Sequence, residues 1–280
     1  MKAMDVGQRP ESEIQQKNHV ERAIIMAAGT GTRMRPVTLT TPKPLIRVKG
    51  VRMIDTVIQA LHENGIYEIY VVVGYRKEQF ACLTAEYKGV TLIENPYWDS
   101  CNNIASLYVA REQLENAMIL DGDQIIYKKE ILAPEFTHSG YNAVWTDEKT
   151  DEWLMQVKDG IVCSCSRTGG KGGWQLFSVS RWNREDGKRL KRHLELEFEK
   201  KQNRQIYWDD VAMFCHFEEY ELGIYPMQEG DLIESRFAVE RRNRTIYKRM
   251  REYLYELKHN DELVTSLLPL GDGVAVSTKR

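Results

Sequence analysis

The chain has 280 residues, of which 42% are hydrophobic, and its formal net charge at pH 7 is −2. This length and apolar content suit one large α/β domain, or one domain with an appended lobe. The near-neutral charge gives no general attraction to nucleic acid or to an anionic membrane surface, so we expect neither as a partner.

The cysteines and the hydropathy of the chain indicate which broad class of protein to expect. The five cysteines, at 82, 101, 163, 165 and 215, are odd in number and scattered, which does not predict a disulfide framework. No apolar run approaches the ~18 residues of a membrane span, and we find no secretory signal. We therefore expect a soluble, cytoplasmic protein without membrane insertion.

The first 20 residues predict an extension outside the fold. Residues 1–20 are polar, lack apolar periodicity and include Gly7 and Pro10. A segment of this composition buries too little apolar surface to become ordered. We expect 1–20 to be mobile, the folded domain to span 21–258, and 259–280 to form a weakly patterned tail.

The chain is organised around a loop that follows a buried strand. An apolar run over 22–27 ends in small residues, and the loop continues into two arginines. Backbone N–H groups of such a loop can approach an anion closely, and guanidinium groups bind phosphate oxygens strongly. The loop predicts a polyphosphate site whose candidate residues are Ala28, Gly29, Thr30, Gly31, Thr32 and Arg33.

Two familiar phosphate loops do not match this stretch. The dinucleotide fingerprint requires a third glycine where Met34 stands, and the Walker loop requires a Gly-Lys-Ser/Thr ending that is absent. An ordinary strand-to-loop turn is the plainer alternative. That alternative explains neither the arginines nor Lys43, whose backbone is fixed on both sides by Pro42 and Pro44. We therefore favour the polyphosphate site.

Strand and helix patterns alternate from residue 22 to about 146. The expected strands are 22–27, 67–73, 90–93 and 117–120, and the expected helices are 52–64, 76–87 and about 103–115. This order predicts an α/β fold with a doubly wound, mostly parallel, Rossmann-like sheet and helices on both faces. Ligands of such sheets bind at the carboxyl ends of the strands.

An Asp-Gly-Asp turn follows the strand 117–120. Asp121 and Asp123 flank Gly122 at the edge of the sheet where the loop also lies. Two carboxylates around a glycine can place one on a divalent cation and leave the other to orient it. An acidic turn without a ligand is the alternative, but beside a polyphosphate loop we favour a Mg²⁺ ligand.

The second half predicts a mixed extension of the sheet. Its expected strands are 141–146, 153–157, 161–166, 173–180 and 221–227, and its expected helices are the charged segment 184–202 and the segment 237–258. Between them, adjacent aromatic and acidic residues occupy 206–211. A surface helix has no need of that pattern.

Three motifs, taken in order, resemble the nucleotidyltransferases that activate sugar phosphates and related alcohols: Ala27–Pro36, Thr41–Leu45 and Asp121–Asp123. Within that superfamily the chain is most similar to the bacterial phosphocholine cytidylyltransferases. That similarity extends from about 22 to about 250 and rests on Val73–Phe80, Asn102-Asn103, Ser106-Leu107, Glu152-Trp153 and Tyr207–Asp209.

The resemblance implies a reaction and a set of roles. CTP would lie over 28–33, with Arg33 on its phosphates, and Lys43 would neutralise the α-phosphate and the incoming phosphate. Mg²⁺ would be the cofactor. The acceptor oxygen would attack in line and displace pyrophosphate, so catalysis would be positioning plus charge stabilisation. The resemblance further assigns Asp123 and Asp209 to the metal, and Gly74, Asn102, Asn103 and Asp121 to the nucleotide.

Phosphocholine as the acceptor sets a requirement of its own. A quaternary ammonium donates no hydrogen bond, so aromatic faces and a carboxylate must hold it. The resemblance places this pocket at Trp153, Tyr207 and Glu234, although core aromatics are the plainer reading of the first two. Arg236 stands where an acidic residue is expected.

The leading hypothesis is therefore a cytidylyltransferase that forms CDP-choline, and a homodimer is possible. The same chemistry on 2-aminoethylphosphonate, phosphoethanolamine or a sugar 1-phosphate is the alternative. A regulatory subunit without catalysis is a more distant one. A subunit that has lost catalysis should also have lost at least one of four residues: Arg33, Lys43, Asp123 and Asp209. All four are present in this chain.

Overall fold

The structure is a computed structural model that describes residues 17–234, 263–268 and 274–279. The chain divides into two compact units, Met1–Leu232 and Ile233–Arg280. In the second unit, β16 (Leu263–Leu268) and β17 (Val274–Lys279) form an antiparallel hairpin. The domain boundary expected at 258 lies outside the described residues. The helix expected at 237–258 lies outside the described residues.

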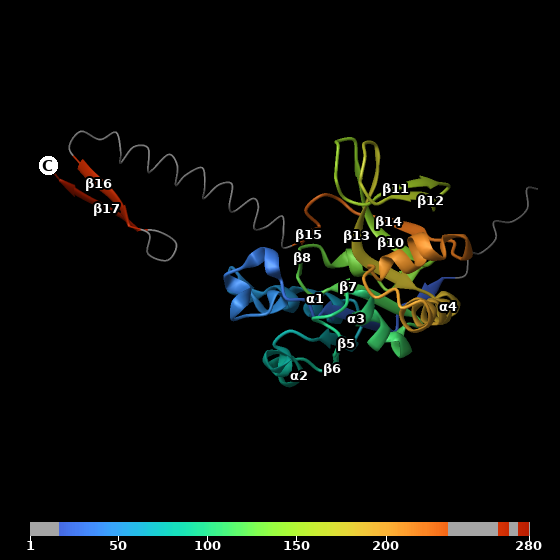
Figure 1. Ribbon diagram of the computed structural model, residues 1–280. Helices are drawn as coiled ribbons and strands as arrows, with labels where there is room; N and C mark the ends of the chain where they lie inside the picture. The colour runs from blue at the N-terminus through green and yellow to red at the C-terminus, as the bar shows by residue number, and fades with distance from the viewer. Residues whose placement is uncertain (1–16, 235–262, 269–273, 280) are drawn as a thin grey trace, which may run out of the picture. The chain divides into compact units, whose positions relative to one another are not determined.

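A nine-stranded sheet forms the first unit, in the order β10-β14-β12-β11-β13-β7-β2-β5-β6 (Figure 1). Its strands are β2 (Arg22–Ala27), β5 (Glu68–Val73), β6 (Val90–Glu94), β7 (Ala117–Asp121), β10 (Gly140–Thr146), β11 (Leu154–Lys158), β12 (Ile161–Ser166), β13 (Gly173–Trp182) and β14 (Gly223–Pro226). The half from β7 to β6 is parallel, whereas β13 runs antiparallel to β7. This confirms the predicted α/β fold with a mixed extension.

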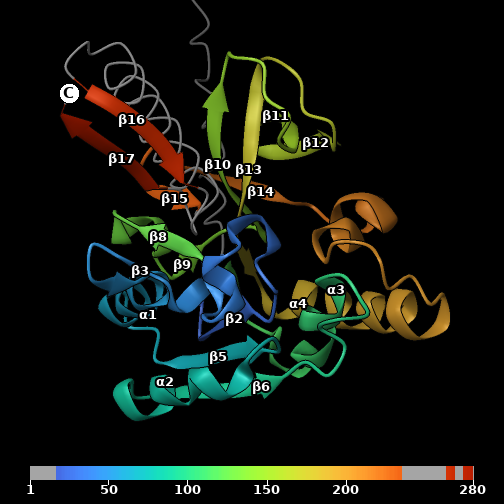
Figure 2. The same ribbon diagram turned by 60° about the vertical axis from the view of Figure 1, so that its left-hand side comes forward.

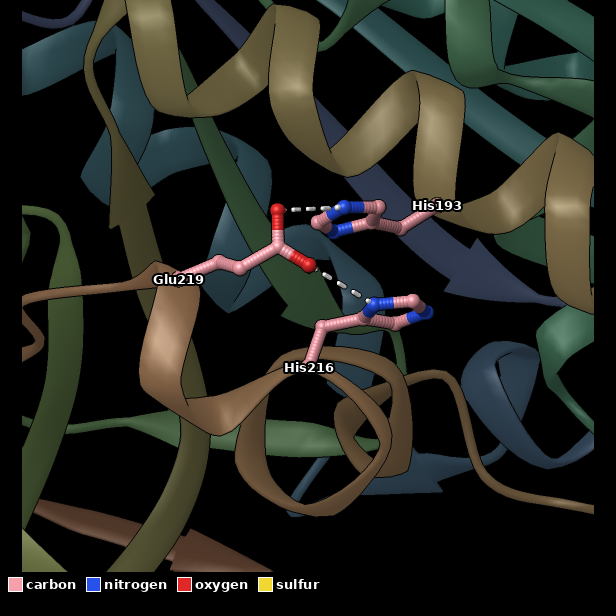
Figure 3. Close-up of side chains that lie close together, drawn as sticks. All are labelled: His193, His216 and Glu219. Carbon is pink, nitrogen blue, oxygen red and sulfur yellow. Dashed lines mark hydrogen bonds and ion pairs between the residues drawn. The ribbon is translucent and has the colours of Figure 1, made fainter.

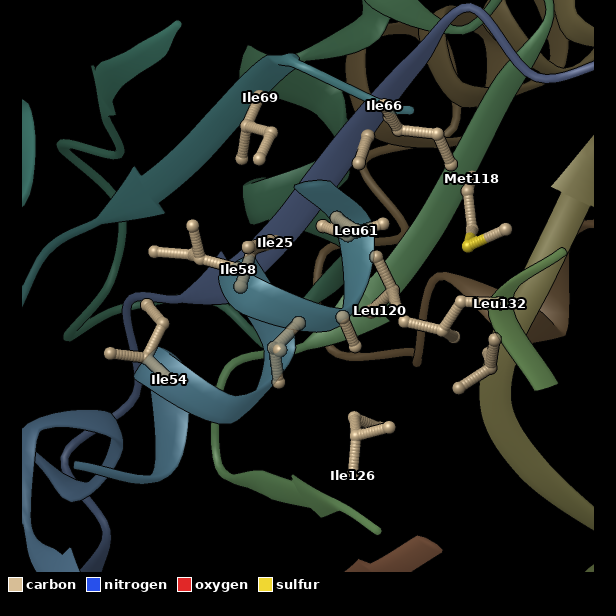
Figure 4. Packing of buried hydrophobic residues seen from close by; sticks show 14 of the residues in the cluster. Ile25, Ile54, Ile58, Leu61, Ile66, Ile69, Met118, Leu120, Ile126 and Leu132 are labelled. Atoms are coloured by element: carbon tan, nitrogen blue, oxygen red, sulfur yellow. The ribbon is translucent and has the colours of Figure 1, made fainter. Parts of the chain in front are cut away.

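The helices cover both faces of this sheet (Figure 2). They are α1 (Met53–Glu63), α2 (Ala81–Glu86), α3 (Ile104–Val109) and α4 (Arg184–Glu195). Successive residues of β2 point to opposite faces, so Ile25 packs with the residues of α1 and α2, and Ile24 packs with those of α3 and α4. Figure 4 shows the first of these cores, where Ile54, Ile58 and Leu61 of α1 lie over Ile25.

Several α-helices are shorter than predicted, and short 3-10 or π-helical turns lie next to them. The short helical turns are η1 (Thr32–Met34), η2 (Val37–Leu39), η3 (Lys43–Leu45), η4 (Lys77–Phe80), η5 (Arg111–Gln113), η6 (Lys129–Leu132), η7 (Leu196–Lys200), η8 (Val211–Cys215) and η9 (Phe217–Glu219). The segment expected as one helix over 184–202, for example, is α4 followed by the π-helical turn η7. Among the described helices, none is long and apolar enough to cross a membrane.

Short strands complete the fold. They are β1 (Asn18–His19), β3 (Arg47–Val48), β4 (Val51–Arg52), β8 (Gln124–Ile126), β9 (Glu135–Phe136) and β15 (Leu232–Glu234). β1 pairs with β9, and Val20 is only 1% exposed. The mobile extension expected over 1–20 is therefore wrong for residues 18–20, because the pairing of β1 with β9 and the burial of Val20 hold them in place. Residues 1–16 lie outside the described part of the chain.

The register of the parallel strands brings three predicted segments to one edge. Ala27 at the end of β2 lies opposite Val73 of β5, and Met26 lies opposite Asp121 of β7. The loop at 28–33, Gly74 and the Asp-Gly-Asp turn therefore all begin at the carboxyl edge of the sheet.

Candidate active site

The conformation of the loop depends on Gly31. This residue adopts the left-handed region, with φ of 63°, and its carbonyl accepts a hydrogen bond from Thr38 Oγ1 at 2.9 Å. A Cβ atom at Gly31 would lie 2.9 Å from Thr38 Cγ2 and 3.1 Å from Lys43 Cβ. Both the backbone angle and the packing therefore require glycine here.

Gly29 is different, because no protein atom lies within 4 Å of the place where its Cβ would be. It lines a cavity, and it is exposed. Packing within the protein therefore does not require a glycine at this position. The open space beside its backbone leaves room for a ligand to approach the N–H groups closely.

Lys43 and Asp123 meet across this edge of the sheet. Lys43 begins η3 between Pro42 and Pro44, and its Nζ forms an ion pair with Asp123 Oδ2. The two side chains are 17% and 24% exposed, so the pair is partly shielded from water. Gly122 lets the turn pack closely against β2, since a Cβ there would lie 3.2 Å from Ile25 Cγ2. The predicted proximity of Asp123 and the loop is thus present.

A cavity of about 290 Å³ lies between these segments. The predicted residues that line it are Ala28, Gly29, Gly31, Thr32, Arg33, Lys43, Asn103, Asp121 and Asp123. Met26, Ala27, Pro44 and Ser106 also line it and were not expected as site residues. Ser106 had a signal in the sequence, because it belongs to one of the segments on which the resemblance rests. Its hydroxyl accepts a hydrogen bond from Asn95 Nδ2 at 3.0 Å.

Three predicted nucleotide residues are not among those that line the cavity: Thr30, Gly74 and Asn102. The structure gives two of them a packing role. A Cβ at Gly74 would lie 2.5 Å from Trp98 Cβ, so glycine is needed there for close packing. Asn102 donates to the carbonyl of Gln205 at 3.1 Å and accepts from the N–H of Asn103 at 2.7 Å. Their contacts with a nucleotide stay predictions.

Asn103 links the cavity to the segment of adjacent aromatic and acidic residues. Its side chain lines the cavity, and its Oδ1 accepts a hydrogen bond from the N–H of Trp208 at 2.8 Å. Asp210 Oδ2 in turn accepts from the N–H of Tyr207 at 2.8 Å. Asn103 is therefore hydrogen-bonded to the residue that follows Tyr207.

The two aromatic residues expected in the acceptor pocket lie side by side. The rings of Trp153 and Tyr207 are 6.1 Å apart and nearly perpendicular, at 85°, and Tyr207 is 52% exposed. Trp153 also packs edge-on against Phe214 at 5.1 Å. Glu234, the third expected member, is the last residue of β15 and belongs to the second unit, so it is described apart from this pair.

Arg167 adds a cation beside the aromatic pair, and no motif in the sequence predicted it. Its guanidinium lies 3.8 Å from the ring centroid of Phe214, and its Nε donates to Asp210 Oδ1 at 2.8 Å. Sequence spacing gave no signal for this contact, because 43 residues separate the two partners.

Asp209 carries the most unusual carboxyl group near this segment. Burial first, and then the neighbouring Asp210, raise the pKa of Asp209 to about 8. Its Oδ1 makes no regular hydrogen bond to any residue that the structure describes, although it faces Tyr141 closely enough for the two groups to interact. Asp209 is not among the residues that line the cavity.

These carboxylates suit a hard divalent cation such as Mg²⁺, which prefers oxygen ligands. Asp121 and Asp123 line the cavity, and Asp123 already faces a cation, the Lys43 ammonium. The buried Oδ1 of Asp209, which no regular hydrogen bond satisfies, is the kind of atom that an ion would complete. That Asp123 and Asp209 share one ion stays a prediction.

Known proteins share both the sequence pattern and the fold. Residues 23–181 match the family described as the MobA-like NTP transferase domain. The chain is 39% identical over 214 residues to the 2-aminoethylphosphonate cytidylyltransferase of Lancefieldella rimae, a match that covers 76% of this chain and 87% of that one. It is 34% identical over 191 residues to the choline-phosphate cytidylyltransferase of Streptococcus pneumoniae, covering 68% and 82%.

Solved structures of nucleotidyltransferases have a similar fold. The CTP:phosphocholine cytidylyltransferase from Streptococcus pneumoniae superimposes with a TM-score of 0.70 at 31% identity, covering 77% of this chain and 93% of that one. The inositol-1-phosphate CTP transferase from T. maritima gives a TM-score of 0.61 at 18% identity, covering 76% and 88%, which shows a shared fold.

Proposed function

Because the chain belongs to the MobA-like NTP transferase family, we propose that it is a cytidylyltransferase that joins CTP to a small phosphorylated amino alcohol and releases pyrophosphate. The observation that carries this proposal is the cavity at the carboxyl edge of the sheet, where the glycine loop, Lys43 and Asp123 converge. The two relatives compared above, 39% and 34% identical to this chain over most of their length, are named cytidylyltransferases.

The loop would hold the triphosphate of CTP. Its backbone N–H groups are accessible at Gly29, and Arg33 at the rim would add a guanidinium to the phosphate oxygens. A polyphosphate brings several negative charges into a cavity that already holds two carboxylates. The cations of the loop and of η3 offset that repulsion.

Lys43 would act during the transfer itself. As the acceptor oxygen attacks the α-phosphate, negative charge spreads over the phosphoryl oxygens, and an ammonium fixed nearby stabilises it without reorganising. Pro42 and Pro44 hold the backbone of Lys43, and Asp123 orients its side chain before substrate arrives. Asp123 and Asp209 would hold Mg²⁺, which would supply further neutralisation of the phosphates.

We propose phosphocholine as the acceptor, on the basis of Trp153 and Tyr207. The two rings are nearly perpendicular and 6.1 Å apart, Tyr207 is half-exposed, and a quaternary ammonium against an aromatic face gains on the order of 1–2 kcal/mol once desolvated. Arg167, whose side chain is 49% exposed, could attract the anionic end of the same acceptor.

A second acceptor, 2-aminoethylphosphonate, is favoured by one observation: the relative that uses this name is 39% identical, against 34% for the choline-phosphate enzyme. A primary ammonium donates three hydrogen bonds and therefore needs oxygen acceptors in addition to an aromatic face. Both acceptors combine a cation with a phosphoryl oxygen, so the transfer step is the same.

The test is pyrophosphate release with CTP and Mg²⁺ across four acceptors: phosphocholine, phosphoethanolamine, 2-aminoethylphosphonate and glucose 1-phosphate. The proposal predicts the highest kcat/KM with phosphocholine. A preference for 2-aminoethylphosphonate would select the second acceptor. A preference for glucose 1-phosphate, or no release while CTP still binds, would overturn the proposal.

A further inference from the structure

Three ionisable side chains that do not line the cavity form a cluster of their own. His193 comes from α4, His216 follows η8, and Glu219 ends η9 (Figure 3). His193 Nε2 lies 3.2 Å from Glu219 Oε2, and His216 Nδ1 lies 3.2 Å from Glu219 Oε1. Each imidazole ring therefore turns one nitrogen toward the carboxylate of Glu219.

The remaining nitrogen of each ring also has a partner. His193 Nδ1 lies 2.8 Å from Tyr220 Oη, and His216 Nε2 lies 2.9 Å from Glu197 Oε1. Glu197 is buried and is itself held by Lys201 at 2.7 Å. Outer partners of this kind fix the orientation and the tautomer of a histidine and leave its other nitrogen for a ligand.

The charge states of two of these groups suit the same role. Burial first, and then the neighbouring His216, lower the pKa of His193, which favours the neutral imidazole. The hydrogen bond from His216 is the largest of the effects that lower the pKa of Glu219, which keeps its carboxylate ionised. Neutral imidazole and ionised carboxylate are the forms that metal ions bind.

We propose that His193, His216 and Glu219 bind a divalent transition-metal ion of the Zn²⁺ type. Imidazole nitrogen selects such ions over Mg²⁺ and Ca²⁺, which prefer all-oxygen sites. Two histidines, one glutamate and a water molecule make a common four-coordinate zinc set. The proposal does not depend on the nucleotidyl-transfer function, because none of its residues lines the cavity.

Binding of one ion requires a small rearrangement of the three side chains. The candidate ligand atoms lie within 4.8 Å of one another, whereas tetrahedral zinc with bonds of about 2.1 Å places neighbouring ligand atoms about 3.4 Å apart. The two rings are now stacked, with centroids 3.8 Å apart, so they must turn out of the stack to aim both lone pairs at one ion. The side chain of Glu219 is 54% exposed and can move with them.

The ion would join two elements that are distant in sequence. It would tie the last turn of α4 to the segment after η8, which begins directly behind Asp209 and Asp210. Binding would therefore restrain the chain that carries Tyr207 and the buried carboxylates. We infer a structural ion that stiffens this segment.

The experiment is calorimetric titration of Zn²⁺ into the tag-free, chelator-treated full-length protein. Glu219→Gln removes a ligand from an exposed position, and Glu218→Gln, one residue away and also exposed, is its matched control. We expect one Zn²⁺ site in the wild type and in Glu218→Gln, and an affinity at least about tenfold lower in Glu219→Gln. Co²⁺ should give ligand-field bands without thiolate charge transfer, and only where Glu219 is intact.

One further variant and a melting comparison separate this site from the cavity and from misfolding. Asp123→Asn should leave the Zn²⁺ affinity unchanged, and metal-free melting of Glu219→Gln should match that of Glu218→Gln. Equal Zn²⁺ affinity in Glu219→Gln and Glu218→Gln, no Zn²⁺ binding by the wild type, or loss of the site in Asp123→Asn would overturn the proposal.

Discussion

Glycines at two positions of the same sheet edge serve different purposes, and the difference can be measured. Gly74→Ala places a methyl group against Trp98 and should lower stability by about 1–3 kcal/mol, seen as a lower Tm. Gly29→Ala meets no protein atom, so its Tm should stay near that of the wild type while the Kd for CTP rises about tenfold or more. A Gly29→Ala protein that binds CTP normally would contradict a phosphate role for this backbone.

We expect Lys43 to act mainly in the transfer step and much less in the binding of CTP. Lys43→Ala should reduce kcat about 100-fold or more, because it removes a fixed charge from the developing transition state. The Kd for CTP should rise much less, since the loop and Arg33 remain. Lys49→Ala, which removes an exposed lysine of the β3–β4 turn, is the control. A loss confined to CTP affinity would assign Lys43 to binding alone.

The buried carboxyl of Asp209 predicts how stability depends on pH. Its pKa is raised from 3.8 to about 8, so between these values the folded protein keeps a proton that the unfolded chain releases. Stability from this group is therefore fully present below pH 4 and is lost as pH rises to about 8, by at most about 1.4 kcal/mol per pH unit.

Asp209→Asn removes that titration. In EDTA, the Tm of the variant minus that of the wild type should grow from pH 5 to pH 8 and then level off. A Tm difference that stays constant or shrinks over this range would contradict a raised pKa of the buried Asp209 carboxyl. Buffer pairs that overlap in pH control for ion-specific effects.

At the scale of elements, the start of β11 and the segment before η8 together supply the aromatic pair. Trp153→Ala should raise the KM for the acceptor about tenfold, the equivalent of one cation–π contact, and leave that for CTP nearly unchanged. Trp145→Ala, an exposed tryptophan of β10, is the matched control. Equal losses for both substrates would mean that Trp153 serves packing against Phe214 instead.

Periodicity predicted the elements well where they are long and buried. The strands at 22–27 and 117–120 and the helix at 52–64 lie within a residue or two of their expected bounds, because continuous apolar runs and one-sided helical faces leave strong patterns. The two-residue strand at 18–19 left no pattern. Its order comes from β9, more than 100 residues away, and from the burial of Val20.

For the whole molecule, the sequence identified the loop, Lys43 and Asp123 but not everything that completes the site. Ser106 and Arg167 contribute through contacts that only the folded sheet creates. The same holds for the His193–His216–Glu219 cluster, which joins α4 to the segment from His216 to Glu219. Spacing along the chain reveals residues that share one loop or one helix face, whereas residues joined across elements need the topology as well.

Whether nucleotidyl transfer takes place in the cavity can be decided from the turnover of CTP and the preferred acceptor by Asp123→Ala, with pyrophosphate and the cytidylylated product both quantified. We expect equal amounts of the two products from the wild type and a rate at least about 100-fold lower in the variant. Its Tm should be close to that of the wild type, because Asp123 lies on the cavity wall. Near-normal turnover by a folded Asp123→Ala protein would show that the cavity is not where the transfer occurs.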